Sequence, residues 1–271
     1  MIIHPLTKAL GALVDDIDLT ALIPQSFEEI YRAFLQHKVL FFRDQTMSPE
    51  QHLAFGKMFG ELEPAHPFFP HLVESDQVVI IETSRGNPPG ESFWHTDMTW
   101  QKVAPKCSIL HAQHVPIEGG DTIWSNMAAV FASLSKEDQI MLRSMDAIHG
   151  LHAFEGSRYD EQDDSGKSRV VQKSQAYPPI VRPMVTRHPE TGEEVLFINE
   201  QFTRSVVGLD DVESRVLLDR LFAVTRQTQF HVRFQWQAGT VAIWDNRVTQ
   251  HFAVTDYGDQ PRRLHRVTVR G

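Results

Sequence analysis

Two histidines and one aspartate carry the strongest chemical signal in this chain. His95 and Asp97 are separated by one residue, and His251 follows far downstream. In an extended segment, residues i and i+2 point to the same side, so the side chains of His95 and Asp97 can reach one metal ion. A His-x-Asp pair with a distant histidine is the ligand set that holds non-haem iron(II) and leaves other coordination positions open. The pattern therefore predicts a catalytic metal centre, because structural metal sites are closed.

The other histidine pairs do not fit this chemistry. The chain has 14 histidines, so chance clusters are expected, but His95-Thr96-Asp97 is its only His-x-Asp sequence. His111 and His114 lie on an expected strand, where residues i and i+3 face opposite sides and cannot chelate together. His149 and His152 have the same spacing. His66 lies in a proline-flanked loop, where spacing alone neither supports nor excludes a role.

Arg262 and Arg266 supply the second signal. They share one face of an expected strand near the end of the chain, and could bind two separate anions on either side of a metal. A guanidinium suits this task because it stays charged when it is desolvated and matches a carboxylate or sulfonate. Arginines in general are solvated, so this interpretation depends on the nearby metal site.

The composition limits the choice of partners and compartment. The chain has 271 residues, 23% of them charged, and a formal net charge of −9, which predicts no general attraction to nucleic acid or anionic membrane. A small anionic substrate must therefore be bound by local cations. The single cysteine, Cys107, lies in an apolar run and is expected to be buried and reduced. With no basic-then-apolar leader and no apolar run of membrane length, we expect a cytoplasmic protein.

Short strands dominate the expected secondary structure. Three helices are indicated, at residues 26–36 with Ser26 opening a capping box, at 48–60, and at 212–224. The expected strands cover residues 38–43, 77–83, 106–114, 121–126, 146–152, 180–186, 195–199, 230–236, 240–244 and 263–269. Many short strands with few helices favour a curled β-sandwich or barrel over a parallel α/β sheet.

A polar insertion interrupts this pattern at about residues 155–176. It contains the acidic run 160–164 and almost no apolar residues, so we expect it to contribute nothing to a core. Such a segment is either a loose loop or a lid over a site, and we expect a lid because an active site is predicted nearby.

At this point the motifs match a known family. The chain resembles the iron(II)- and 2-oxoglutarate-dependent dioxygenases of the taurine dioxygenase type. The resemblance covers nearly the whole chain and rests on five motifs: residues 94–97, 119–122, 197–200 and 244–251, and the pair Arg262 and Arg266. It implies one catalytic domain over residues 1–271 that is mainly β with flanking helices, folded as a double-stranded β-helix, or jelly roll.

The resemblance also implies roles for individual residues. His95, Asp97 and His251 would be the iron(II) ligands, and Arg262 and Thr122 would bind the distal carboxylate of 2-oxoglutarate. A second group would form the substrate site: Arg266, His66, Phe69, Met98 and Phe202. Of these, Arg266 and His66 would hold the sulfonate. Phe202 matches the family's apolar wall. Phe69 replaces a tyrosine, Met98 a valine and Glu91 an asparagine of the taurine enzymes. These changes indicate that the anion-binding residues are kept but that the rest of the substrate differs from taurine.

The implied reaction uses O₂ and 2-oxoglutarate, gives succinate and CO₂, and hydroxylates a small anionic substrate. The first expectation is a sulfonate of the taurine type, releasing sulfite and an aldehyde. Alternatives are the same chemistry on an alkyl sulfate, an aryloxyalkanoate or another small acid. A zinc hydrolase on the same ligands and a non-catalytic anion-binding barrel stay open as more distant alternatives. A homo-oligomer, dimer or tetramer, is expected from the resemblance alone.

Overall fold

The computed structural model describes residues 1–90 and 92–271, so Glu91 lies outside the described residues. Its strands are β1 (Ile2–Pro5), β2 (Ala12–Asp15), β3 (Val39–Phe42), β4 (Val79–Thr83), β5 (Cys107–His114), β6 (Thr122–Asn126), β7 (Asp146–His149), β8 (Ile180–Pro183), β9 (Val185–Arg187), β10 (Glu194–Leu196), β11 (Thr203–Val206), β12 (His231–Phe234), β13 (Val241–Asp245), β14 (Thr249–Ala253) and β15 (Arg262–Val269). Its α-helices are α1 (Pro24–His37), α2 (Pro49–Phe59), α3 (Met127–Ser133), α4 (Lys136–Arg143), α5 (Arg169–Ser174) and α6 (Asp211–Thr225), with short 3₁₀ turns at His152–Phe154 and Thr228–Phe230.

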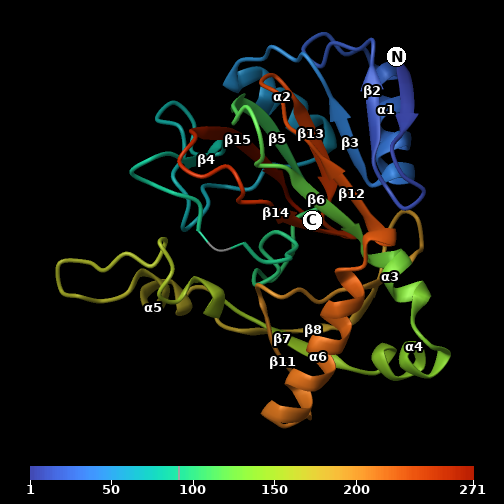
Figure 1. The fold of residues 1–271 in the computed structure, drawn as a ribbon, viewed down its shortest axis with the longest axis vertical. Coiled ribbons are helices and arrows are strands. Elements are labelled where there is room, and N and C mark those ends of the chain that lie inside the picture. Colours follow the sequence, from blue (N-terminus) through green and yellow to red (C-terminus); the bar gives the residue numbers. More distant parts are fainter. Residues whose placement is uncertain (91) are drawn as a thin grey trace.

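A seven-stranded sheet forms the upper half of the molecule (Figure 1). Its strand order is β1-β2-β3-β13-β5-β15-β4, and all neighbours are antiparallel except β2 and β3. Strand β3 and the first four residues of β13 are apolar because both faces of the sheet are covered there. All five residues of β13 are buried, for example. Strand β5, which carries Ser108, and strand β15, which carries Arg262 and Arg266, are each paired with a neighbouring strand on both sides.

A smaller sheet, β12-β6-β14, faces the large one across an apolar layer. Phe41 of β3 stacks on Phe234 of β12 with ring centroids 3.8 Å apart, and Trp124 of β6 packs edge-on against Phe41. Alternating side chains from both sheets fill this layer, as period-two strands require. The two facing sheets give a mainly β jelly roll with flanking helices, which confirms the expected fold class.

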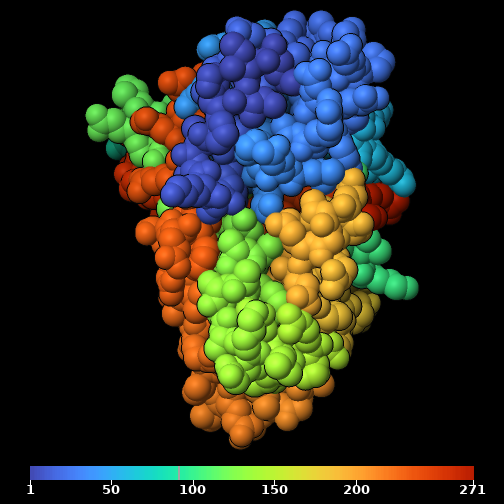
Figure 2. Space-filling view, turned by 90° about the vertical axis from the view of Figure 1, so that its right-hand side faces the viewer, coloured from blue at the N-terminus to red at the C-terminus, as the bar shows by residue number. Residues whose placement is uncertain are grey.

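The remaining elements cover these sheets. Helices α1 and α2 pack on the outer face of the large sheet, where Phe34 and Phe55 both contact Phe59 edge-on. The N-terminal residues form one continuous face over this part of the molecule (Figure 2). A second core lies below, between α3, α6, β7 and β10 (Figure 1). No helix among the described residues combines the length and the apolar character that a bilayer crossing requires.

Several expected boundaries are wrong. Helix α1 begins at Pro24 rather than at Ser26, its N-cap residue Ile23 makes no side-chain cap, and Ser26 lies in its first turn. Proline suits this position because its missing N–H has no partner in a first turn anyway. The strand expected over 146–152 ends at His149, and the strand expected over 180–186 divides into β8 and β9.

The insertion at 155–176 does contribute to a core, contrary to our expectation. Its short helix α5 buries Val170, which is 3% exposed, in an aromatic cluster with Phe68, Trp100, Phe154 and others. Asp160 stabilises the insertion, because its Oδ1 accepts hydrogen bonds from the Ser168 hydroxyl at 2.5 Å and from the Val170 N–H at 3.0 Å. One well-placed valine and one aspartate therefore order a segment whose composition is polar.

Candidate active site

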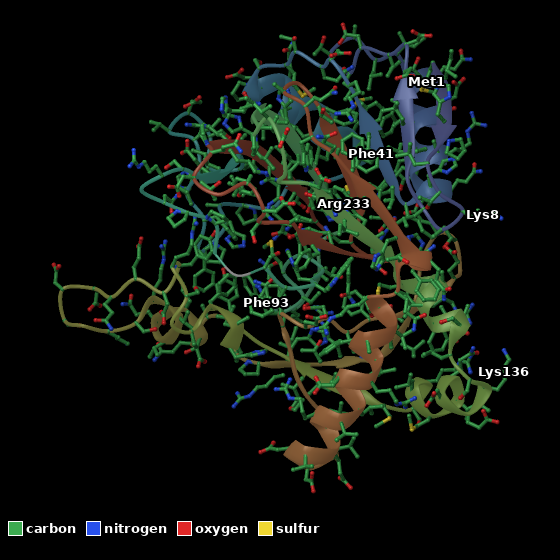
Figure 3. The ribbon with its side chains drawn as sticks, in the orientation of Figure 1. Met1, Lys8, Phe41, Phe93, Lys136 and Arg233 are labelled. Atoms are coloured by element: carbon green, nitrogen blue, oxygen red, sulfur yellow. The ribbon has the colours of Figure 1, made fainter. Side chains whose placement is uncertain are left out.

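The backbone brings the two histidines together. His95 and His251 pair as an isolated antiparallel bridge, with the His95 N–H donating to the His251 carbonyl at 3.0 Å and the His251 N–H to the His95 carbonyl at 2.7 Å. Their ring centroids lie 4.0 Å apart. Phe93, two residues before His95, lies near the middle of the molecule, where the sheets meet the lower elements (Figure 3). A strand pair thus fixes the spacing of two ligands that are far apart in sequence.

Asp97 completes the group. Its Oδ1 lies 3.8 Å from Nε2 of His95 and 4.0 Å from Nε2 of His251. One ligand atom from each of the three residues lies within 4.8 Å of the others, which is the only such group found among the described residues. A metal bonded to all three at about 2.1 Å would hold ligand atoms about 3 Å apart, so small side-chain movements suffice. The donor set and its spacing fit iron(II).

A chain of hydrogen bonds orients the carboxylate. Ser108 on β5 donates to Asp97 Oδ2 at 2.5 Å, the Asn246 amide donates to Ser108 Oγ at 3.0 Å, and the Trp244 indole donates to Asn246 at 2.9 Å. Oδ1 is thereby aimed at the two imidazoles. Such outer hydrogen bonds fix ligand orientation in metal sites. Sequence reasoning missed Ser108, because its hydrogen bond to Asp97 forms only when two separate segments pack together.

All three side chains are in their metal-binding protonation states near neutral pH. Burial lowers the pKa of His95 and of His251 below the ordinary histidine value, so both rings are neutral. The Nδ1 of His95 lies 2.8 Å from the Phe93 carbonyl, and donation of its proton leaves Nε2 free to bind a metal. Burial alone would raise the pKa of Asp97, but the Arg266 guanidinium, supported by the Ser108 hydrogen bond, holds that pKa below its usual value.

Arg262 is a buried cation that lacks a counter-ion. Its side chain is 6% exposed, its Nε has no hydrogen-bond partner, and no ion pair involves it among the described residues. Its guanidinium carbon lies 6.0 Å from the Trp236 ring. Burial lowers the pKa of Arg262, which measures the cost of desolvating this charge. An uncompensated buried guanidinium is destabilising unless an anion binds it, so this position fits a carboxylate.

Thr122 lies beside it on β6. The Trp236 indole donates to Thr122 Oγ at 2.9 Å, which leaves the hydroxyl proton free for an acceptor in the same cavity.

The turn before Thr122 requires glycine at two positions. Gly119 and Gly120 have φ of 77° and 70°, and a Cβ on Gly119 would stand 2.6 Å from Oδ1 of Asp256. Only glycine adopts such a turn at this closeness without strain.

Arg266 lies on the same face of β15, closer to the metal ligands. Its Nη1 donates to Asp97 Oδ1 at 3.0 Å, and its guanidinium carbon lies 5.3 Å from the Phe69 ring. Its Nε is buried without a partner. The two arginines, Thr122, His95, His251 and Phe69 all line one cavity of about 180 Å³, called here the metal-site cavity.

The other expected substrate residues lie around this cavity rather than in its lining. His66 is buried next to Phe69, with ring centroids 4.5 Å apart. Its Nδ1 accepts from the backbone N–H groups of Phe68 and Phe69 at 3.2 Å, so its Nε2 carries the proton. Burial, and then Arg266, lowers the pKa of His66, so the ring is a neutral donor. It lines a neighbouring cavity, to which Phe69 also contributes.

Met98 and Phe202 belong to the aromatic cluster beneath the site. The Phe202 ring lies 6.3 Å from the His95 ring and perpendicular to it. Met98 has φ of 52°, an unfavourable conformation for methionine that turns the chain directly after Asp97. Sequence spacing could not predict this turn.

The site geometry defines a class of protein: a jelly roll with a His-Asp-His metal site and buried cations for a dicarboxylate. The chain belongs to the taurine catabolism dioxygenase TauD, TfdA family, whose family model matches residues 3–268. It is therefore a 2-oxoglutarate-dependent oxidoreductase that uses iron(II), 2-oxoglutarate and O₂. This excludes the zinc hydrolase and the non-catalytic barrel.

Three similar proteins show the range of the family. The chain is 33% identical to an alpha-ketoglutarate-dependent sulfate ester dioxygenase of Pseudomonas putida, over 99% of this chain and 89% of that protein. It is 34% identical to an alkylsulfatase of Acinetobacter baylyi, over 99% of this chain and 84% of that protein. The crystal structure of a taurine dioxygenase from Burkholderia xenovorans, 33% identical, superposes with a TM-score of 0.83 and covers 100% of this chain and 89% of the other.

Proposed function

We propose that this dioxygenase hydroxylates the carbon next to the oxygen of a small organic sulfate ester. The observation that carries the reaction class is the pair of buried arginines on one strand face, beside three metal-ligand side chains. The proposal of a sulfate ester rests on the sulfate ester dioxygenase and the alkylsulfatase to which the chain is similar over 99% of its length. A hydroxylated sulfate ester of a primary alcohol collapses to an aldehyde and sulfate.

Each polar residue has a separate task in this proposal. When bound, iron(II) and 2-oxoglutarate supply the oxidising chemistry, in which O₂ converts 2-oxoglutarate to succinate and CO₂ and one oxygen atom enters the substrate. Arg262 binds the distal carboxylate of 2-oxoglutarate, and the Thr122 hydroxyl donates to the same group. Arg266 attracts the sulfate and thereby holds the reacting C–H bond at the metal.

His66 and the apolar residues complete the proposed substrate site. His66, which lines the neighbouring cavity, donates from Nε2 to the sulfate once Phe69, which lines both cavities, moves aside. Phe69 lines the cavity, and Met98 and Phe202 pack in the apolar cluster around it, so the surroundings suit a hydrocarbon tail better than the ammonium group of taurine. A sulfonate of the taurine type is the second candidate, and the likeness to a taurine dioxygenase structure supports it.

A substrate panel tests this function. The purified protein with iron(II), 2-oxoglutarate and O₂ is offered hexyl sulfate, hexanesulfonate, taurine and phenoxyacetate, and succinate formation is measured. We expect hexyl sulfate to give the highest kcat/KM, with sulfate and hexanal formed in equal amounts. Sulfite from hexanesulfonate or taurine at a higher kcat/KM would replace the sulfate ester by the sulfonate. Phenol from phenoxyacetate as the main product would replace both.

Further properties belong to the same proposal. Residues 1–271 form one catalytic domain, and the insertion at 155–176 acts as a lid whose mobility changes when substrate binds. The enzyme works in the cytoplasm, where the free thiol of Cys107 and a ferrous ion both stay reduced. It works as a dimer or tetramer, which light scattering at micromolar concentration tests. A mass equal to the 31.0 kDa chain would contradict the oligomer.

A further inference from the structure

Tyr159, in the insertion, lies where three cavities meet. The first is the metal-site cavity. The second, called here the outer vestibule, has about 720 Å³ and is lined by Phe93, Phe154, Tyr257 and others. The third, the arginine cavity, has about 380 Å³ and is lined by His66, His71, Arg158, Arg169 and others. Of the described residues, only Tyr159 lines all three.

The tyrosine ring forms part of each wall. It lies 4.6 Å from the Phe69 ring and 6.3 Å from the Phe154 ring, centroid to centroid. Phe69 and Tyr159 are the only described residues shared by the metal-site cavity and the arginine cavity. Besides Tyr159, the metal-site cavity and the outer vestibule share three apolar residues, Ile81, Phe93 and Ala253, and three polar ones, Ser92, Gln201 and Arg262. A hydrocarbon tail that extends from the metal-site cavity into the vestibule therefore crosses a boundary to which the Tyr159 ring contributes.

The residues on either side of Tyr159 hold it in place. Arg158 donates to the carbonyls of Pro88 and Glu82, the latter at 3.1 Å, and so ties the insertion to the end of β4. Asp160 accepts from the Gly156 N–H at 2.9 Å and from the start of α5. Arg158 thus fixes the segment to β4 and Asp160 fixes it within the insertion, so the ring between them has little freedom to turn away.

We propose that Tyr159 determines which substrate tails the enzyme accepts, because its ring narrows the passage from the metal-site cavity to the outer vestibule. This inference rests on the proposed sulfate ester function. An unbranched tail passes the ring, and a tail branched close to the sulfate meets it. An extra methylene or branch in an apolar pocket changes kcat/KM by roughly 10- to 200-fold, so the ring can set a strong preference.

The test compares hexyl sulfate with 2-ethylhexyl sulfate in wild type and variants. The measured quantity is the ratio of kcat/KM for the branched ester to that for the unbranched one, in which a general loss of folded protein cancels. Tyr159→Ala should raise this ratio about tenfold or more, and the larger ring of Tyr159→Trp should lower it. Tyr159→Phe keeps the ring and should leave the ratio unchanged, and all three variants should keep the wild-type KM for 2-oxoglutarate.

Tyr177→Ala is the matched control. Tyr177 packs on Trp100 in the same aromatic cluster, with ring centroids 4.8 Å apart, but lines none of the three cavities. An unchanged ratio in both Tyr159→Ala and Tyr159→Trp would overturn the inference, as would an equal shift in Tyr177→Ala. If wild type accepts neither ester, the sulfate ester proposal fails. The ratio is then measured with branched and unbranched members of the accepted class, so the role of Tyr159 is still decided.

Discussion

Replacing Arg262 by methionine separates the cost of burying its charge from the contribution of that charge to 2-oxoglutarate binding. Arg262 is 6% exposed and has no ion-pair partner among the described residues, so the ligand-free protein bears the cost of desolvating its guanidinium. An apolar side chain of similar length removes that cost, and such replacements of buried charges are neutral or stabilising by about 1–4 kcal/mol. The same change removes the partner of the 2-oxoglutarate carboxylate, which costs about 2–5 kcal/mol, or roughly 30-fold or more in affinity.

Thermal unfolding measures both effects without any turnover. Under anaerobic conditions with iron(II), 2-oxoglutarate at 100 times its wild-type Kd should stabilise wild type by about 2.7 kcal/mol. For a chain of this length that is a rise in Tm of about 5 °C. With a 30-fold weaker Kd, the same concentration stabilises Arg262→Met by about 0.9 kcal/mol, a rise below about 2 °C. In the absence of ligand, the variant should unfold at or above the wild-type Tm.

Arg263→Met is the control for this measurement. Arg263 is the next residue on β15 and faces the other side, where its guanidinium lies 3.6 Å from the Glu82 carboxylate. It should keep the full rise in Tm with 2-oxoglutarate. A full rise in Arg262→Met, or its loss in Arg263→Met, would refute the assignment of Arg262 to the co-substrate.

Three further predictions concern the rest of the site. Ser108→Ala removes the hydrogen bond to Asp97 Oδ2 and should weaken iron(II) binding by roughly 10- to 100-fold, measured by anaerobic titration. Arg266→Ala should keep the visible charge-transfer band of iron(II) with 2-oxoglutarate but lose the stimulation of succinate formation by the prime substrate. Metal-free protein should lose stability as the pH falls below about 6.5. Burial depresses the pKa of His52 and of His149 to about 3, so between pH 3 and 6.5 the unfolded state binds protons that the folded state does not. Each contributes about 1.4 kcal/mol per pH unit, and His52→Leu should flatten the dependence of unfolding free energy on pH.

Each of these has a clear contrary result. Ser125→Ala is the control for Ser108→Ala, because the buried Ser125 hydroxyl donates to the Thr225 carbonyl and not to a metal ligand. An equal loss of iron affinity in Ser125→Ala would show that the loss in Ser108→Ala is not specific to the hydrogen bond with Asp97. Loss of the charge-transfer band in Arg266→Ala would mean that the two arginine roles are exchanged. An unchanged pH slope in His52→Leu would mean that His52 becomes protonated without unfolding.

The sequence predicted that His95, Asp97 and His251 would lie together, and their ligand atoms lie within 4.8 Å of one another. The co-substrate roles of Arg262 and Thr122 followed from the family resemblance and stay predictions. Alternation along a strand places Arg262 and Arg266 on one face, and the His95–Asp97 spacing lets one metal reach both side chains. The expected strands predicted a curled β-sandwich or barrel for the same reason, and the family resemblance specified the jelly roll. Ser108 could not be assigned, since its bond to Asp97 depends on how two distant segments pack. The position of Tyr159 was not predicted for a different reason. The polar composition of the insertion indicated that it would not pack into a core, although a few of its residues do order it.

The reciprocal backbone hydrogen bonds between His95 and His251 have a consequence for how the enzyme is loaded. In small zinc domains the metal organises the chain, and its removal unfolds them. Here the backbone pairing already sets the spacing of His95 and His251, two of the three metal ligands, so binding of the ion requires little further ordering of the chain. We therefore expect the folded, metal-free protein to take up iron(II) without a new round of folding.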